Sequence, residues 1–346
     1  MNSKTGVDIS IVIPLYNEEE NVVALYQELR DMIDAQQGKR YEIIFVDDGS
    51  YDKTVDKLVE TVGDDAGVVV IEFFRNFGQT AALAAGFNKA SGRVIVPMDG
   101  DLQNDPKDVP MLVEKLEEGR GWDIVSGWRK ARKDKWMSRR LPSVLANWLI
   151  KRLTWTQEIH DFGCTLKAYR AEVLEDVKLY GEMHRFLPAI CKWRGARITE
   201  VVCNHRPRVA GVSKYGLKRT MKVMLDLLTV KFLGDYLTKP IYFFGKLAVF
   251  VVLFSFMSLA VAIVQKFGHW TEHGKAVMLN DNVLVTFAAM LFMMAIMFLM
   301  LGIISELLSR IYHEAQDRTP YKIRNTFGQT HAEAEVKEEP AGAGAV

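Results

Sequence analysis

The chain has 346 residues, enough for one large domain or two ordinary ones. Its 44 Lys and Arg residues balance 43 Asp and Glu residues, and the net charge of +1 argues against a bulk nucleic-acid binder. The mean hydropathy of +0.00 is high for a soluble enzyme and indicates that part of the chain lies outside water.

The chain begins without an apolar stretch before Ile9, so we expect no signal peptide. Its three cysteines, Cys164, Cys191 and Cys203, lack CxxC spacing. We therefore expect reduced thiols facing a cytosol and no zinc site.

Short β-branched runs alternate with helical segments over the first 128 residues. The predicted strands are residues 9–14, 41–46, 68–74, 93–97 and 122–128, with helical periodicity at 18–35 and 107–118. This alternation predicts an α/β fold with a mainly parallel sheet. Ligands of such sheets bind beyond the carboxyl ends of the strands. Four polar stretches fall at those ends: PLYNEEE, DDGS, RNFGQ and DGDLQND.

Polar residues follow the first two predicted strands. Tyr16 is a candidate for base stacking and Glu18 for hydrogen bonding, whereas Asn17 and Glu20 fit a capping box at the start of the next helix. Asp48, in VDDGS, could accept hydrogen bonds from a base or ribose. The alternative is an Asx turn whose serine caps the following helix.

Carboxylates crowd the stretch PMDGDLQND directly after the fourth predicted strand. Asp99, Asp101 and Gln103 are spaced by two and would share one face of an extended segment. Such oxygen ligands suit Mg²⁺ or Mn²⁺, which bind through one or two carboxylates plus substrate phosphates. We expect Asp105 to cap the helix that starts near Lys107.

The chain contains neither GxGxxG nor GxxxxGK[ST], which disfavours a nicotinamide dehydrogenase and a P-loop NTPase. Nucleotide phosphates would then be neutralised by a metal and by two basic stretches. Residues 128–152 carry nine Lys or Arg against one acid, and residues 205–222 carry no acid. Docking on anionic lipid headgroups is the alternative use of these charges.

Two long apolar segments, 241–264 and 283–305, are transmembrane candidates. Residues 223–237 mix an apolar face with charges and predict an amphipathic helix on a membrane, or else a surface helix of the globular part. Lys and Arg flank the apolar pair, so the positive-inside rule predicts cytoplasmic flanks and an outside loop at 265–282.

The six motifs IVIPLYNEEE, VDDGS, RNFGQ, DGDLQND, HDFGCTLKAYR and RVAGVSK occur in this order and resemble the family-2 glycosyltransferases with a GT-A fold. The subgroup most similar in these motifs makes polyprenyl-phosphate sugars and includes dolichol-phosphate mannose synthases and bacterial polyprenyl-phosphate glycosyltransferases. The resemblance covers residues 8–322, including both apolar segments.

This resemblance implies an inverting, metal-dependent transfer of a hexose from a nucleotide sugar to undecaprenyl or dolichyl phosphate at the cytoplasmic membrane face. UDP-glucose is the first expected donor and GDP-mannose the second, while UDP-linked amino or uronic sugars stay open. Mg²⁺ or Mn²⁺ is the implied cofactor, and related enzymes suggest a homotetramer. The implied organisation is a cytosolic GT-A catalytic domain at 1–212, interfacial amphipathic helices at 213–239, a two-helix transmembrane hairpin at 240–308 and a partly disordered cytosolic tail at 309–346.

The family's functional positions carry over to matching residues. Those lining the nucleotide pocket are Pro14, Tyr16, Glu18 and Asp48. Those of the metal and donor diphosphate site are Asp99, Asp101 and Gln103. Those of a loop that closes over the diphosphate are Arg206, Arg208, Ser213 and Lys214. Those holding the acceptor phosphate are Arg129, Arg139 and Ser143, and Asp161 matches a residue near the transferred sugar. Catalysis is expected from Asp101, Asp161 and Arg129.

The acceptor chemistry supports this expectation. A phosphate monoester is largely dianionic at neutral pH, because its second pKa is about 6, so it needs no strong general base. We therefore expect Asp161 to orient sugar or acceptor, while the metal and Arg clamps bring the anions together. Gly100 stands where many relatives have alanine, and we expect it to loosen the loop slightly while both carboxylates remain.

The sequence leaves two other functional hypotheses open. A processive polysaccharide synthase would need a membrane channel and a QxxRW motif, and this sequence has neither. A non-catalytic membrane scaffold, or a partner subunit of a lipid-carrier flippase, belongs to a different class. Metal-dependent nucleotide binding would separate that class from the enzymes.

Overall fold

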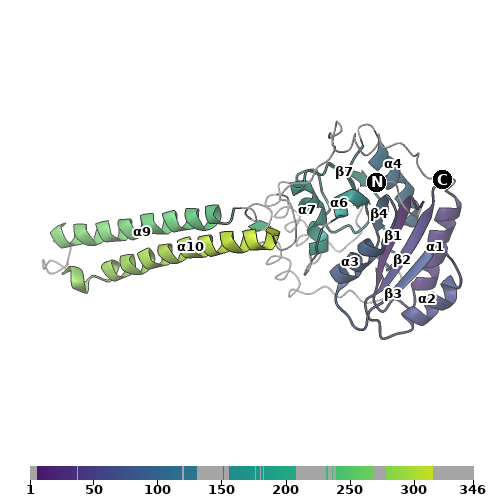
Figure 1. Ribbon diagram of the computed structural model, residues 1–346, viewed down its shortest axis with the longest axis horizontal. Coiled ribbons are helices and arrows are strands. Elements are labelled where there is room, and N and C mark those ends of the chain that lie inside the picture. Colours follow the sequence, from purple (N-terminus) through teal and green to yellow (C-terminus); the bar gives the residue numbers. More distant parts are fainter. Residues whose placement is uncertain are drawn as a thin grey trace, which may run out of the picture. The chain divides into compact units, whose positions relative to one another are not determined.

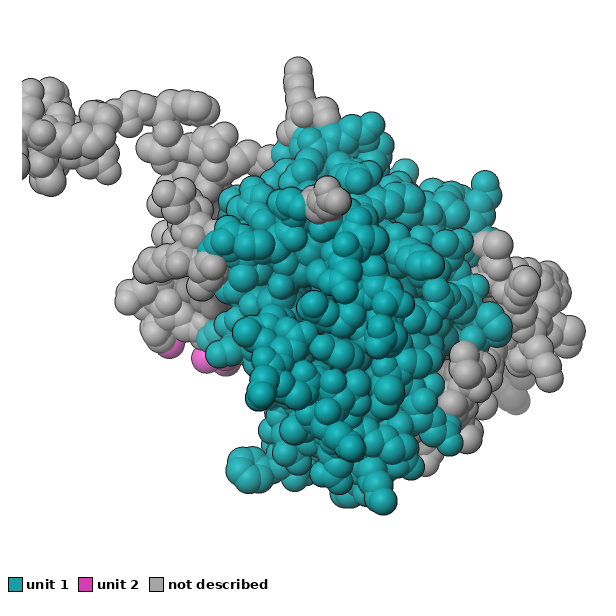
Figure 2. All heavy atoms as spheres, turned by 90° about the vertical axis from the view of Figure 1, so that its right-hand side faces the viewer, with its two compact units in different colours: residues 1–237 teal, residues 238–346 magenta. Residues whose placement is uncertain are grey.

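The computed structural model describes residues 6–36, 38–118, 121–130, 151, 156–175, 177–179, 181, 183–207, 231–232, 236, 239–268 and 278–314. The chain divides into two compact units, Met1–Leu237 and Thr238–Val346. Figure 2 shows the first unit in teal. The predicted amphipathic segment 223–237 and the predicted tail fall largely outside the described residues, and the domain boundaries at 212, 239 and 308 stay predictions.

The first unit contains a seven-stranded sheet with the order β3-β2-β1-β4-β6-β5-β7 (Figure 1). Its strands are β1 Ile9–Leu15, β2 Tyr41–Asp47, β3 Val68–Glu72, β4 Val94–Pro97, β5 Ile124–Trp128, β6 Lys167–Arg170 and β7 Ile198–Val202. The β1–β2, β1–β4, β2–β3 and β5–β7 pairs are parallel, whereas β6 runs antiparallel to β4 and β5. The five predicted strands and the mainly parallel sheet are confirmed, while β6 and β7 were not predicted.

Helices cover both faces of this sheet. Those described in the first unit are α1 Val22–Asp34, α2 Thr54–Val62, α3 Gln79–Lys89, η1 Pro106–Asp108, α4 Val109–Glu117, α6 Ala171–Leu174, η3 Met183–Phe186 and α7 Leu187–Trp193. Alternate side chains of β1 point to opposite faces, so Ile11 packs with α1 and α4 while Val12 packs with α3, η3 and α7. The α3 helix lies close to the sheet, because a Cβ on Gly86 would lie 2.2 Å from Val12 Cγ1.

The direction of β6 positions the candidate site. Because β6 is antiparallel to β4 and β5, its first residue lies at the edge where those two strands end. The loop after β4, the residue after β5 and the turn before β6 therefore meet at one edge of the sheet. Three of the expected site residues, Asp99, Arg129 and Asp161, belong to these segments.

The second unit contains two long helices, α9 Ile241–Gly268 and α10 Val283–Glu314, and a short η4 Leu279–Asp281 between them. Within the described residues, Ile241–Phe267 and Val283–Ser309 are long and apolar enough to cross a membrane, with mean hydropathies of 2.8 and 2.7. Only 28% and 17% of these segments are buried, unlike the core helix of a soluble protein. Both predicted apolar segments are thus helical and support membrane association; their orientation stays a prediction.

Candidate active site

Asp99 lies in the loop that follows β4 and is hydrogen-bonded through both carboxylate oxygens. Gln79 Nε2 donates to its Oδ1 at 2.8 Å, and Thr165 Oγ1 donates to its Oδ2 at 2.6 Å. Burial raises the pKa of Asp99 above its ordinary value, and the charge of neighbouring Asp101 raises it further. Asp101 is itself buried, and its Oδ1 accepts from the backbone N–H of Gln103 at 3.2 Å.

The backbone of this loop is not extended, contrary to the prediction from the spacing of its polar residues. The β4 strand ends at Pro97, and Leu102 has a positive φ of 58°. A left-handed leucine is strained and requires strong fixation, which burial of the Leu102 side chain in the core supplies. Gly100 fits closely here, because an added Cβ would lie 2.5 Å from Leu15 Cδ2. The glycine thus permits tight packing, and the expectation that it loosens the loop was incomplete.

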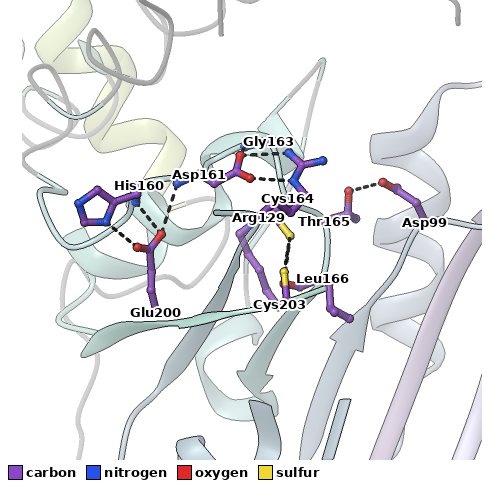
Figure 3. Close-up of polar contacts among 11 residues, drawn as sticks. Asp99, Arg129, His160, Asp161, Gly163, Cys164, Thr165, Leu166, Glu200 and Cys203 are labelled. Carbon is purple, nitrogen blue, oxygen red and sulfur yellow. Dashed lines mark hydrogen bonds and ion pairs between the residues drawn. The ribbon is translucent and has the colours of Figure 1, made fainter. Parts of the chain in front are cut away.

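Arg129 and Asp161 form a buried, two-point ion pair (Figure 3). Arg129 Nε donates to Asp161 Oδ2 at 2.7 Å, and Nη2 donates to Oδ1 at 3.0 Å. Burial alone would lower the pKa of Arg129, but the hydrogen bonds and charge of Asp161 raise it well above its ordinary value. Gly163 makes room for the pair, since a Cβ there would lie 3.2 Å from Arg129 Nη2. Arg129 therefore stays a fixed cation at the sheet edge.

Lys167, on β6, is a second buried cation beside the same acids. Burial lowers its pKa, whereas the charges of Asp161 and Asp99 act in the opposite direction. Asp99 and Asp161 thus both interact with Arg129 and Lys167, and Asp101 adds a third carboxylate charge beside Asp99.

The donor set fits Mg²⁺ or Mn²⁺ bound partly through substrate phosphates. Within the described residues no group of three or more His, Cys, Asp or Glu side chains could hold a metal by itself. The half-buried Asp99 and the buried Asp101 supply two carboxylates, which is the number that a phosphate-bridged divalent cation requires. Gln103 is the third expected ligand, and the structure places it two residues beyond Asp101 on the same loop.

Asp48 makes structural contacts at the end of β2. Its carboxylate accepts from the backbone N–H of Phe77 at 2.7 Å and of Gly78 at 2.9 Å, so it fixes the RNFGQ loop. Burial raises its pKa despite these hydrogen bonds. The predicted Asx turn with a capping serine was wrong. Asp47 accepts from Ser50 N, three residues on, at 2.8 Å. Ser50 Oγ accepts from Asn17 N at 2.9 Å, while α2 begins only at Thr54.

The other residues expected to line the nucleotide pocket lie in β1 and in the loop that follows it. Pro14 is in β1, and the Tyr16 ring meets Tyr51 edge-on with centroids 6.4 Å apart. Glu18 Oε2 accepts from Asn21 Nδ2 at 2.6 Å.

The capping box predicted for Asn17 and Glu20 was wrong. The α1 helix begins at Val22, because residues 18–21 form turns. Asn17 has a φ of 53°, and its Oδ1 accepts from the backbone N–H of Tyr51 at 2.9 Å. Asn17 therefore joins the β1 loop to the β2 loop. Asparagine is among the few residues that adopt this left-handed conformation easily.

Arg206 connects the acidic loop to α1. Its guanidinium binds Glu28 at 2.6 Å and Asp105 at 2.8 Å, and its backbone N–H donates to Gln103 O at 3.0 Å. Asp105 also caps η1 as predicted, accepting from Lys107 N at 3.1 Å. The other expected phosphate contacts lie outside the described residues: Arg139, Ser143, Arg208, Ser213 and Lys214.

Sequence reasoning missed four polar residues of this edge: Gln79, Thr165, Lys167 and Glu200. A signal existed for two of them. Lys167 and Glu200 are charged residues inside the strand runs KAYR and ITEVV, where burial requires a partner. Gln79 and Thr165 carry no comparable signal.

Residues 10–178 match the family model Glycosyl transferase family 2. A dodecaprenyl-phosphate galacturonate synthase from Rhizobium johnstonii is 40% identical over 328 residues, which cover 93% of this chain and 94% of the relative. An undecaprenyl-phosphate 4-deoxy-4-formamido-L-arabinose transferase from Edwardsiella ictaluri is 34% identical over 324 residues, covering 93% and 95%.

The solved structure of glucosyl-3-phosphoglycerate synthase from Mycobacterium tuberculosis, in complex with Mn²⁺, uridine diphosphate and phosphoglyceric acid, matches with a TM-score of 0.52. It is 22% identical, and the match covers 66% of this chain and 80% of that chain. At this identity the likeness concerns the fold, which is the expected GT-A arrangement. With the two curated relatives, which span nearly the full chain, it settles the assignment: the chain belongs to glycosyltransferase family 2, in the group of polyprenyl-phosphate sugar transferases.

Proposed function

We propose that this chain transfers a sugar from a nucleoside diphosphate to the phosphate of an undecaprenyl-type lipid, with a divalent cation and with inversion at the anomeric carbon. One observation carries this proposal: the buried acidic loop of Asp99 and Asp101 and the fixed cation Arg129 lie at the same edge of the sheet. An acid pair suits a metal-bound diphosphate, and a buried arginine suits a second phosphate.

The proposed roles follow from the charges. Asp99, Asp101 and Gln103 hold the cation, which when bound offsets the charge of the donor diphosphate. Arg129 uses Nε and Nη2 to bind Asp161, and we assign Nη1 to the acceptor phosphate. The acceptor oxygen is already anionic, so Asp161 holds Arg129 in place without removing a proton. The acceptor oxygen then attacks opposite the departing nucleoside diphosphate.

The relatives guide the choice of sugar. Their names contain galacturonate and a formamido-arabinose, and this supports a uronic or modified amino sugar ahead of the glucose and mannose expected from the motifs. We place the uronic acid first because the galacturonate synthase is 40% identical. The donor nucleotide is proposed to be UDP.

The decisive experiment uses the full chain in lipid nanodiscs with undecaprenyl phosphate. The donors are UDP-galacturonate, UDP-4-deoxy-4-formamido-L-arabinose, UDP-glucose and GDP-mannose, each labelled in the sugar. One donor should give a lipid-soluble product that carries a single sugar and disappears with EDTA, and NMR of that product should show an inverted anomeric centre. A folded protein that transfers none of them overturns the proposal. A polymeric product would instead support the processive synthase.

A further inference from the structure

Glu200 lies in the middle of β7, and its side chain is 7% exposed. A carboxylate removed from water in this way is unfavourable unless hydrogen bonds compensate for the lost hydration. Neither the family positions nor the charges of the acidic loop account for it. Its partners therefore indicate what it does.

The Glu200 carboxylate binds three groups, which belong to His160 and Asp161. Both residues lie in one turn, HDFG, which precedes β6 by three residues. Glu200 Oε1 accepts from the backbone N–H of His160 at 2.5 Å and of Asp161 at 3.3 Å. Its Oε2 lies 2.7 Å from His160 Nδ1. Figure 3 shows the Glu200 carboxylate beneath this turn, on the side away from Arg129. One buried side chain thus fixes two successive backbone groups and one ring.

On its other side, the same turn holds Arg129, the arginine that we assign to the acceptor phosphate. Asp161 binds Arg129 at two points and also accepts from the Gly163 N–H at 3.1 Å. The His160 ring stacks on Trp128, with centroids 4.7 Å apart and planes 22° apart. Trp128 immediately precedes Arg129, so the turn restrains Arg129 through its ion pair and through its neighbour.

We propose that Glu200 is a positioning residue for the acceptor phosphate. It acts through the HDFG turn, which sets where Asp161 holds the guanidinium of Arg129. This inference rests on the proposed function, because it assigns Arg129 to the acceptor. A shift of about 1 Å at such a clamp lowers the rate by up to roughly a hundredfold. Loss of the Glu200 side chain should therefore weaken binding of the acceptor phosphate and leave donor binding intact.

The experiment compares Glu200→Ala, Glu200→Gln and the control Glu158→Ala in the full chain in nanodiscs. Glu158 lies just before the same turn, where it binds Lys192 at 2.6 Å with a side chain that is 46% exposed. Glu200→Ala should raise the KM for undecaprenyl phosphate about tenfold or more while the donor KM changes less than about twofold. Glu200→Gln keeps an oxygen for the two backbone N–H groups and should recover most of the acceptor affinity. Glu158→Ala should match the wild type.

A merely structural role predicts a different result. Partial unfolding would lower the active fraction, and therefore kcat, without separating the two KM values. That outcome, or equal acceptor KM values in Glu200→Ala and Glu158→Ala, overturns the proposal. If Glu200→Ala does not fold, Glu200→Asp, whose carboxylate is one methylene shorter, replaces it in both measurements, and an acceptor KM equal to that of the wild type then overturns the proposal.

A second measurement does not need turnover. Phenylglyoxal modifies accessible arginines, and the Arg129 side chain is only 10% exposed. Mass spectrometry should show faster modification of Arg129 in Glu200→Ala, or in Glu200→Asp if Glu200→Ala does not fold, than in the wild type, Glu200→Gln and Glu158→Ala. Equal rates overturn the positioning role. If the wild type transfers no sugar, the proposed function fails, and this measurement alone tests whether Glu200 holds Arg129.

Discussion

Thr165 Oγ1 donates a 2.6 Å hydrogen bond to Asp99 Oδ2, joining two residues that are 66 positions apart. Asp99 follows β4, whereas Thr165 lies in the turn that enters β6. The bond links the acidic loop to the segment that carries Asp161. It also opposes the effects of burial and of Asp101 on Asp99, since it lowers the pKa of that carboxyl.

Removing this bond should weaken metal binding. Thr165→Val retains the shape but loses the donor, so the Asp99 carboxylate becomes harder to ionise. A hydrogen bond to a charged group is worth about 1.5–3 kcal/mol, so Mn²⁺ affinity should fall roughly tenfold or more. Calorimetric titration with Mn²⁺ and a nucleoside diphosphate measures this. Thr165→Ser keeps the hydroxyl and should bind as the wild type does; equal weakening in both variants would contradict the assignment.

Metal binding should depend on pH in a predictable direction. Burial and Asp101 raise the pKa of Asp99 above the ordinary 3.8, and a divalent cation requires the ionised form. Affinity should therefore decrease as the pH falls toward the raised pKa, and within that pH range binding should release protons. Calorimetry in two buffers of different ionisation enthalpy measures that release. Its absence, or an affinity that is constant down to pH 4, would argue against Asp99 as a ligand.

Asp101 should be required for transfer. Asp101→Asn removes one of the two carboxylate charges at the proposed cation, and turnover should fall about a hundredfold to a thousandfold. Asp56→Asn is the matched control, because Asp56 is an exposed acid in the first turn of α2. Product formation with a fixed donor and undecaprenyl phosphate is the readout, and a loss of less than about threefold would contradict the metal assignment.

The Arg129–Asp161 pair should be strongly coupled. Removing one partner of a buried pair leaves an uncompensated charge and costs about 3–5 kcal/mol, whereas removing both costs less. Asp161→Leu and Arg129→Met should each lower the free energy of unfolding more than the double variant does. A double-mutant cycle in denaturant measures the coupling. All three variants should lose transfer, so restored stability without restored activity separates folding from catalysis; additive stability losses would refute the coupling.

Tyr41 should make the protein less stable at alkaline pH. Burial raises its pKa to about 12, so between pH 10 and 12 the unfolded chain loses this proton while the folded chain keeps it. Stability therefore falls as the pH rises through that window, and Tyr41→Phe should flatten the slope. The Tyr41 hydroxyl is also buried without a hydrogen-bond partner among the described residues, so this variant should gain about 1 kcal/mol.

Thermal unfolding against pH tests the Tyr41 prediction. Tyr26→Phe is the comparison, because the Tyr26 hydroxyl donates to Asp65 at 2.8 Å and its removal should reduce stability. A similar loss in both variants would show that the Tyr41 hydroxyl has a partner in solution.

The sheet was predictable where strands are apolar and continuous. Runs such as ISIVIP and YEIIFV are buried on both faces, and their β-branched residues mark strands independently of the rest of the chain. The β6 and β7 strands contain the charged residues Lys167 and Glu200, which interrupt the apolar pattern, and the partners that stabilise buried Glu200 lie 39 and 40 residues away in sequence. Local pattern could not reveal those partners, so both strands were missed.

The site was predictable in its residue types but not in its geometry. The acids of DGDLQND and the arginine of SGWR were visible in the sequence, yet the left-handed backbone of Leu102 was not. That conformation depends on burial of its side chain beneath the loop, which is a tertiary effect. Asp48 likewise reads as a ligand contact in sequence, and the structure gives it two backbone partners.

The antiparallel direction of β6 has a consequence for the length of the chain that precedes it. Arg129 and Asp161 bracket the stretch 130–160, and their ion pair holds both ends of it at one edge of the sheet. Closing a longer loop between fixed ends adds only about 0.6 kcal/mol for each doubling of its length. A longer chain between residues 130 and 160 should therefore cost little stability, provided that Arg129 and Asp161 keep their ion pair.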